Sequence, residues 1–119
     1  MIFQFKKEIP NVNARKLECN KIRAQCPDKI PIILEKDPNC KIEPLDKTKF
    51  LVPLAFKSYQ FCSMIRKKFS LPENQAFFLL AEGKHTITGD ILMAEIYEKY
   101  RDKEDGFLYV SYSSEVTWG

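Results

Sequence analysis

The stretch KIPIILE (29–35) decides the fold, because it has the alternation of a β-strand that carries apolar residues on both sides. Successive side chains of a strand point to opposite faces. One face carries Ile30, Ile32 and Leu34, and the other carries Pro31, Ile33 and Glu35. Pro31 has no N–H to donate, so its nitrogen must face away from a paired neighbour. We therefore expect one face on the main core, and Pro31 and Ile33 directed away from it.

The sequence on either side predicts two helical segments before this strand and a strand–helix–strand–helix–strand order after it. Prolines end several segments, and the spacing of apolar residues distinguishes helices from strands. The expected helices cover 3–8, 12–25, 57–69 and 91–100, and the further strands cover 49–53, 76–81 and 107–113.

Four details of this order are also predicted. Leu17, Ile22 and Cys26 are the apolar positions expected for an amphipathic helix over 12–25. The run AFFLLA (76–81) is expected as a central strand covered on both faces. Residues 82–89 are expected as a turn, and Asp90 as the cap of the last helix.

This order predicts an α+β protein with the β-grasp plan of ubiquitin. The expected architecture is a mixed four-stranded sheet with two packed helices, preceded by two N-terminal helical segments. We expect an N-terminal helical extension over 1–26 and a β-grasp domain over 27–119, forming one compact unit.

Length and charge exclude several classes. The 119 residues allow one domain. There is no apolar run of the roughly 20 residues that a membrane span needs. We expect no secretory signal, because MIFQFKKEIP (1–10) has no uninterrupted apolar region. Residues 1–72 carry 15 basic and 7 acidic side chains, whereas residues 73–119 carry 4 and 9. The basic half is either a solvated helix face or a surface for an acidic partner or an anionic membrane. Without a nucleic-acid-binding motif, we expect no nucleic acid partner.

The sequence contains no recognisable set of catalytic or metal-binding residues. The cysteines Cys19, Cys26, Cys40 and Cys62 have no CxxC spacing, and His85 lies far from all of them. We therefore expect free thiols, no metal, no cofactor and no enzyme activity.

Four blocks in the right order resemble the autophagosomal ubiquitin-like modifiers, that is, the autophagy-related light chain and GABA-receptor-associated protein family. The blocks are PDKIPIILEK (27–36), LDKTKFLVP (45–53), QFCSMIRKKFSL (60–71) and FLYVSYSSEVTWG (107–119). The resemblance extends over essentially the whole chain, including EIP…KIR (8–23).

The resemblance implies a protein tag that an E1-like and an E2-like enzyme attach through Gly119 to phosphatidylethanolamine, and that a cysteine protease releases. The protein would be cytoplasmic, and would lie on the autophagosome membrane after lipidation. Glycine suits such a terminus because it has no side chain to obstruct a narrow enzyme tunnel. Taken alone, a C-terminal glycine favours a mere chain end. If Gly119 is the conjugation residue, it is either the encoded terminus or a processed or truncated end.

The resemblance also implies a docking surface for aromatic-x-x-aliphatic motifs of cargo receptors along 49–53, by β-augmentation. The aromatic pocket would use Glu18, Ile22, Pro31, Ile33, Lys49, Leu51 and Phe107. The aliphatic pocket would use Phe50, Val52, Pro53, Phe56, Phe61, Met64 and Ile65. Lys29, Lys47 and Arg66 would attract the acidic residues beside such motifs.

Alternatives remain open for these residues and for the whole chain. Lysines on an exposed edge strand also serve to block unwanted pairing. Phe61, Met64 and Ile65 also suit plain core packing, and both roles can hold at once. The chain as a whole could be a non-conjugated adaptor for trafficking proteins or microtubules, with basic helices on acidic tubulin tails, or a modifier of proteins rather than lipid. Departures from the family pattern occur at Leu54, Ala55, Gly106, Ser114 and Trp118.

Overall fold

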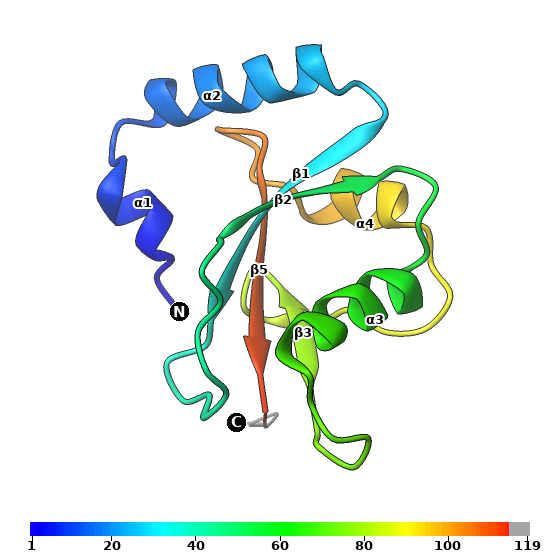
Figure 1. Cartoon of the computed structure of the whole chain (residues 1–119). Coiled ribbons are helices and arrows are strands. Elements are labelled where there is room, and N and C mark those ends of the chain that lie inside the picture. The colour runs from blue at the N-terminus through cyan, green and yellow to red at the C-terminus, as the bar shows by residue number, and fades with distance from the viewer. Residues whose placement is uncertain (115–119) are drawn as a thin grey trace.

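The elements of the computed structural model, which describes residues 1–114, follow the predicted order (Figure 1). The helices are α1 (Gln4–Glu8), α2 (Val12–Gln25), α3 (Ser58–Phe69) and α4 (Met93–Tyr100). The strands are β1 (Lys29–Lys36), β2 (Lys49–Pro53), β3 (Phe78–Ala81), β4 (His85–Thr86) and β5 (Leu108–Ser113). The predicted α+β β-grasp class is confirmed, while the division of the chain after residue 26 stays a prediction.

The sheet has the order β2-β1-β5-β3-β4, with β1 and β5 parallel and every other pair antiparallel. Two central parallel strands flanked by antiparallel ones form the mixed sheet that was expected. The expected number of four strands was one too few, because β4 lies within the predicted turn. Glu82 and Gly83 both have positive φ, and Lys84 N donates to Ala81 O at 3.0 Å, which closes a tight hairpin from β3 to β4.

The prediction for β3 was wrong in one respect. Leu79 and Ala81 are buried, but Phe78 and Leu80 on the other face are only half-buried. Within residues 1–114, the two-residue β4 is the sole strand beyond β3, so β3 lies close to a sheet edge and is not central.

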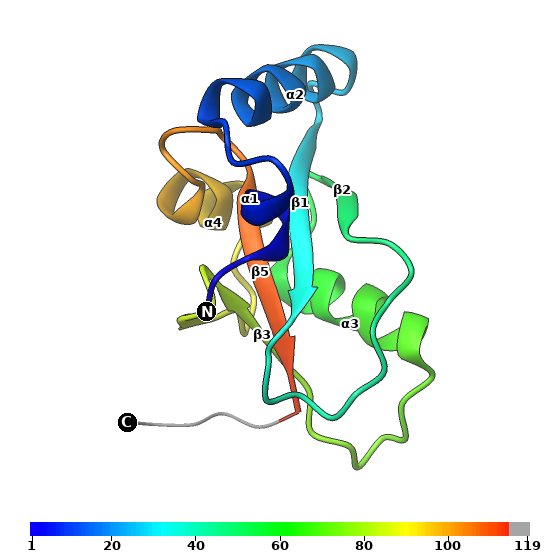
Figure 2. The same cartoon turned by 90° about the vertical axis from the view of Figure 1, so that its left-hand side faces the viewer.

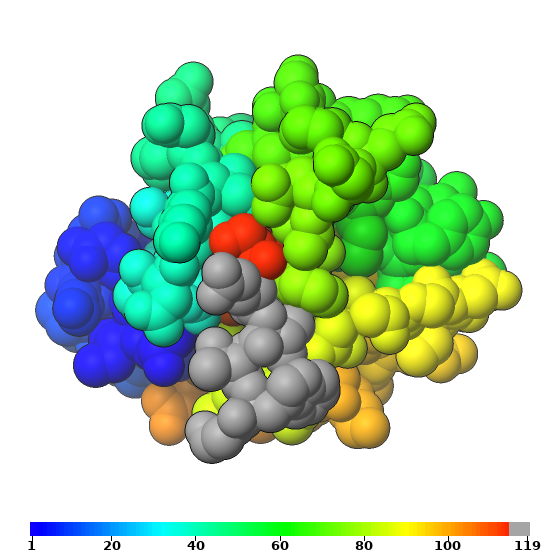
Figure 3. All heavy atoms as spheres, turned by 90° about the horizontal axis from the view of Figure 1, so that it is seen from below, coloured from blue at the N-terminus to red at the C-terminus, as the bar shows by residue number. Residues whose placement is uncertain are grey.

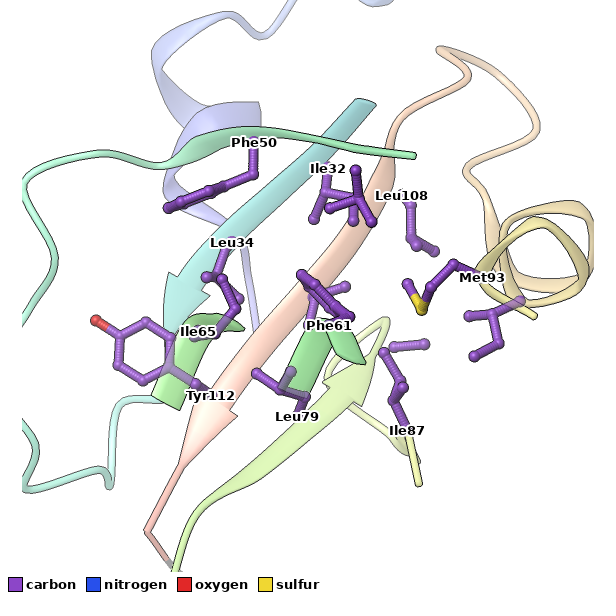
Figure 4. Close-up of a cluster of buried hydrophobic side chains, with 14 of the residues drawn as sticks. Ile32, Leu34, Phe50, Phe61, Ile65, Leu79, Ile87, Met93, Leu108 and Tyr112 are labelled. Carbon is purple, nitrogen blue, oxygen red and sulfur yellow. The ribbon is translucent and has the colours of Figure 1, made fainter. Parts of the chain in front are cut away.

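The main core lies between the sheet and helices α3 and α4 (Figure 4). Alternate residues of β1 and β5 supply the sheet side: Ile30, Ile32, Leu34, Leu108, Val110 and Tyr112. The helices supply Phe61, Ile65, Met93, Ile96 and Tyr97. The face predicted for Ile30, Ile32 and Leu34 is therefore confirmed.

A smaller core lies on the opposite face of the sheet, under α1 and α2 (Figure 2). Its buried members are Phe3, Phe5, Cys19, Ile33, Phe107 and Tyr109. The odd-numbered β1 residue Ile33 thus points away from the main core, as its register predicts. Both central strands are covered on both faces, so β5 is buried at every position.

Two helix details differ from the predictions. Leu17 is 58% exposed, because the inner face of α2 is formed by Arg15, Cys19 and the half-buried Ile22. Asp90 does not cap α4: Leu92 occupies the cap position without a side-chain bond, and Asp90 Oδ1 instead lies 3.6 Å from Lys57 Nζ.

Candidate functional site

Strand β2 forms an open edge of the sheet, since β1 is its sole neighbour in the described part of the chain. The pairing to β1 is fixed at both ends of β2, where Leu34 N donates to Thr48 O (2.7 Å) and Leu54 N donates to Asp28 O (3.0 Å). Paired and unpaired positions alternate in an antiparallel ladder. The main-chain N–H and C=O groups of Lys49 and Leu51 are therefore directed to the open edge, where an added strand can meet them.

The side chains of β2 divide between the two faces of the sheet. Phe50 and Val52 point into the main core and are buried. Lys49 and Leu51 are exposed on the α2 face, opposite Ile33 and Pro31 of β1. Any strand added to this edge meets an apolar surface on each side.

A groove of about 380 Å³ follows this edge. It brings together seven of the residues predicted for the two pockets, together with the predicted supporting charge Lys47. The seven are Ile22, Pro31, Lys49, Leu51, Phe107, Phe50 and Met64, and Ile32 and Lys68 complete the lining. Its α2 side holds most of the predicted aromatic pocket, and its α3 side holds part of the aliphatic one.

The α2 side is closed by an ion pair across the groove. Lys49 Nζ bonds Glu18 Oε1 and lies 5.3 Å from the ring centroid of Phe5. Glu18 thus acts on the groove through Lys49, although it is not part of the lining. Ile33 is fully buried in the smaller core and supports the floor from below.

Helix α2 is positioned by a buried polar network that the sequence did not reveal. Arg15 Nε donates to Asp105 Oδ2 at 2.8 Å, and Tyr109 Oη donates to the same oxygen at 2.5 Å. Phe107 N donates to Asp105 Oδ1 at 2.9 Å, and Arg15 Nη1 donates to Ile9 O at 2.7 Å. Arg15 and Asp105 are 6% and 1% exposed.

The network shifts the titration of its members. Burial and the hydrogen bond to Asp105 raise the pKa of the Tyr109 hydroxyl. Burial alone would lower the pKa of the Arg15 guanidinium, but the bond to Asp105 and nearby negative charge raise it above its ordinary value. Arg15 therefore stays positively charged, and the negative charge of Asp105 is needed to compensate this buried charge.

Gly106 allows α2 to approach the start of β5. Its φ is +89°, a conformation that favours glycine, and a Cβ there would lie 3.0 Å from Cys19 Sγ. Tyr97 Oη donates to Gly106 O at 2.6 Å and ties the same turn to α4. The departure from the family pattern at this position thus coincides with close packing of α2.

The residues predicted for the aliphatic pocket separate into two layers. Val52, Phe61 and Ile65 are fully buried in the main core, so they form the support of the groove. Pro53, Phe56 and Met64 are half-buried and remain accessible. Met64 lines the groove, while Phe56 lines a neighbouring depression.

The positive charges beside the groove differ from the predicted set. Lys47 Nζ and Lys68 Nζ lie 5.4 Å and 5.6 Å from the ring centroid of Phe50. Arg66 turns away, because its Nη2 donates to Pro72 O at 2.5 Å. Lys29 is exposed at the other end of β2, opposite Pro53. Lys68 was not among the residues predicted for the site; its i, i+4 spacing from Met64 is the signal that links it to the groove.

Other kinds of site have little support within residues 1–114. No cluster of three or more His, Cys, Asp or Glu side chains could hold a metal there. All four cysteines are free thiols, and burial raises the pKa of Cys19 and of Cys62 to about 11. Of the described helices, none has the length and apolar character needed to cross a membrane.

A β-grasp domain with an N-terminal helical cover and an open, grooved edge strand defines a ubiquitin-like protein. Residues 14–119 match the family model described as "Autophagy protein Atg8 ubiquitin like". The chain therefore belongs to the Atg8 family of ubiquitin-like autophagy proteins, as the resemblance implies.

Individual relatives agree with this assignment. Microtubule-associated protein 1 light chain 3 gamma of Homo sapiens is 43% identical over 95% of this chain and 77% of its own length. Autophagy-related protein 8 of Pichia angusta is 44% identical over 98% and 90%. The crystal structure of Trypanosoma brucei ATG8 superposes with a TM-score of 0.87, at 38% identity and full coverage of both chains. Gly119, the predicted conjugation residue, lies outside the described residues.

Proposed function

We propose that the protein is a ubiquitin-like modifier that recruits autophagy cargo receptors and adaptors by binding aromatic-x-x-aliphatic motifs along β2. The observation that carries this proposal is the open edge of β2 with an apolar groove on both of its faces. A docked peptide would bond to the main chain of Lys49 and Leu51 and continue the sheet.

The spacing of the motif supports this assignment. Residues three apart in an extended strand point to opposite faces. The aromatic residue would therefore enter the α2 side, beside Ile22, Leu51 and Phe107. The aliphatic residue would enter the α3 side, on Phe50 and Met64. Lys47 and Lys68 would attract acidic residues that flank the motif.

Calorimetric titration with three synthetic peptides tests this binding. We expect the peptide with Trp and Leu at the two motif positions to bind. Peptides with Ala in place of either residue should lose at least tenfold in affinity, or about 1.4 kcal/mol. Equal affinity of all three peptides would contradict the proposal.

We further propose that the carboxyl group of Gly119 is joined to the amine of phosphatidylethanolamine, so that the bound cargo is held at the autophagosome membrane. The expected partners are an E1-like activating enzyme, an E2-like conjugating enzyme and a cysteine protease that reverses the linkage. The support comes from the family assignment and from the end of the described chain after β5, drawn in red, which reaches the molecular surface (Figure 3).

Reconstituted conjugation on phosphatidylethanolamine liposomes tests this second part. The wild-type chain should gain the mass of the lipid, and Gly119→Ala should not, while its affinity for the motif peptide stays the same. A lipid adduct on Gly119→Ala, or a peptide remnant in place of the lipid, would contradict it.

A further inference from the structure

A second depression, of about 380 Å³, lies on the outer face of α3. We call it the α3 depression; its lining residues are Phe56, Tyr59, Gln60, Ser63, Met64 and Lys67. Met64 lines both this depression and the groove beside β2, so the two are neighbours that meet at this side chain. Tyr59 is 56% exposed and belongs to neither of the two cores, so its aromatic ring is presented at the surface.

The direction of a peptide docked on β2 leads toward the α3 depression. On the proposed function, the aromatic residue lies beside Lys49 and Leu51, and the predicted aliphatic pocket extends beyond them to Val52 and Pro53 at the end of β2. A peptide that fills both pockets therefore runs parallel to β2. Helix α3 runs back in the opposite direction (Figure 1). Lys68, one residue before the C-terminal end of α3, lies over Phe50. The N-terminal end of α3 follows the turn in which Phe56 N donates to Pro53 O at 3.0 Å. The peptide therefore passes Lys68, then Met64, then Gln60.

The spacing also selects one position of the peptide. Side chains two residues apart share a face of an extended strand and are separated by about 6.6 Å. The step along α3 from Met64 to Gln60 is four residues, or about 6 Å. A side chain two positions beyond the aliphatic residue therefore points to the α3 face and reaches the depression.

We propose that the α3 depression binds an apolar side chain at the sixth position of a docked aromatic-x-x-aliphatic-x-apolar segment. This inference rests on the proposed peptide-binding function. Phe56, Tyr59 and Met64 give the depression an apolar lining, which favours a residue such as leucine. Lys67 on its rim favours acidic rather than basic neighbours of that residue.

The test compares two synthetic peptides that carry Trp and Leu at the first and fourth motif positions and differ only at the sixth, which is Leu or Ala. Half-burial of a leucine side chain corresponds to about a fivefold gain in affinity. We expect that gain for the wild-type chain by calorimetry. Tyr59→Ser should reduce the gain to less than about twofold and leave the affinity of the Ala peptide unchanged. Leu17→Ser, which removes an equally exposed side chain from α2, should keep the gain.

The outcomes separate this inference from the function on which it rests. Tight binding of both peptides with equal affinity would overturn the inference and leave the proposed function intact. Failure of both peptides to bind would overturn both. Sedimentation analysis gives a further outcome: a dimer that Tyr59→Ser dissociates would assign the depression to a second copy of the chain, against the proposal.

Discussion

The two faces of the sheet are held by different kinds of interaction. On the α3–α4 face, the core consists of apolar side chains that interlock around Phe61 and Ile65. On the α1–α2 face, a smaller apolar cluster is combined with charges: Arg15 bonds Asp105, Lys6 bonds Asp102, and Glu35 accepts hydrogen bonds at the start of α1.

This difference indicates separate tasks for the two faces. Apolar burial is large and non-directional, and it provides most of the stability of the β-grasp domain. Hydrogen-bonded ion pairs contribute less net stability but fix a geometry. The groove lies where the two faces meet at β2, so its α3 side rests on the apolar core and its α2 side on the polar network.

The largest expected effect concerns the apolar face. Phe61→Ala removes a fully buried ring and should lower the free energy of unfolding by about 4 kcal/mol. Urea denaturation measures this change. As a control, Leu17→Ala at an exposed site should change stability by less than about 0.5 kcal/mol. Similar losses for the two variants would remove the basis for the comparison.

The next effect concerns the polar face. Asp105→Asn leaves the buried Arg15 without a countercharge and should cost about 3 kcal/mol. A double variant, Arg15→Met with Asp105→Asn, removes both charges, keeps a side-chain oxygen as an acceptor, and should recover a substantial part of that loss. Denaturation of the three proteins tests this order. If the double variant is less stable than Asp105→Asn, the pair itself stabilises the fold more than this account allows.

A smaller effect is expected for substitutions in the groove. It concerns the affinity for the motif peptide and not the stability of the fold. Lys49→Ala combined with Leu51→Ala should weaken binding of the motif peptide at least tenfold, or about 1.4 kcal/mol. Both side chains are exposed, so the free energy of unfolding should change by less than about 0.5 kcal/mol. Calorimetry and denaturation of the same sample check both halves, and unchanged affinity would exclude β2 as the docking strand.

The smallest effect is a pH dependence on the polar face. Burial alone would raise the pKa of Asp102, but hydrogen bonds from Lys6 and from the backbone N–H groups of Asp105 and Glu104 lower it below its ordinary value of 3.8. A carboxylate with a lowered pKa stabilises the fold above 3.8, and this contribution is lost as the pH falls through the lower, folded-state value. The stability difference between wild type and Asp102→Asn should therefore shrink below pH 3.8. A constant difference at all pH values would contradict this role of Asp102.

The apolar face was predictable from sequence to a larger extent than the polar face. The alternation of Ile30, Ile32 and Leu34 identifies the core side of β1, because a strand has a fixed period of two. Nothing local marks Arg15 as buried, since its partner Asp105 lies 90 residues away in sequence. Charged side chains of a helix ordinarily face water. The sequence therefore favoured the apolar Leu17 over the charged Arg15 as a buried position of α2.

The part of the candidate site that is built on β2 could be predicted from the sequence. The family resemblance and the register of β1 together identified the α2 side of the groove. The place of Lys68, the turn of Arg66 toward Pro72, and the depression beside Tyr59 depend on how α3 is rotated on the sheet. Helical periodicity fixes that rotation only approximately, because the inner and outer stripes of a short helix overlap.

Amide hydrogen exchange with and without a bound motif peptide tests the central claim that β2 is the docking strand. The amides of Lys49 and Leu51 face the open edge, and peptide binding should slow the exchange of Leu51 strongly. The amides of Phe50 and Val52 already bond to β1 and should change much less. Slowed exchange at Leu51 would agree with strand addition at this edge, whereas unchanged exchange at Leu51 with a saturating peptide would contradict it.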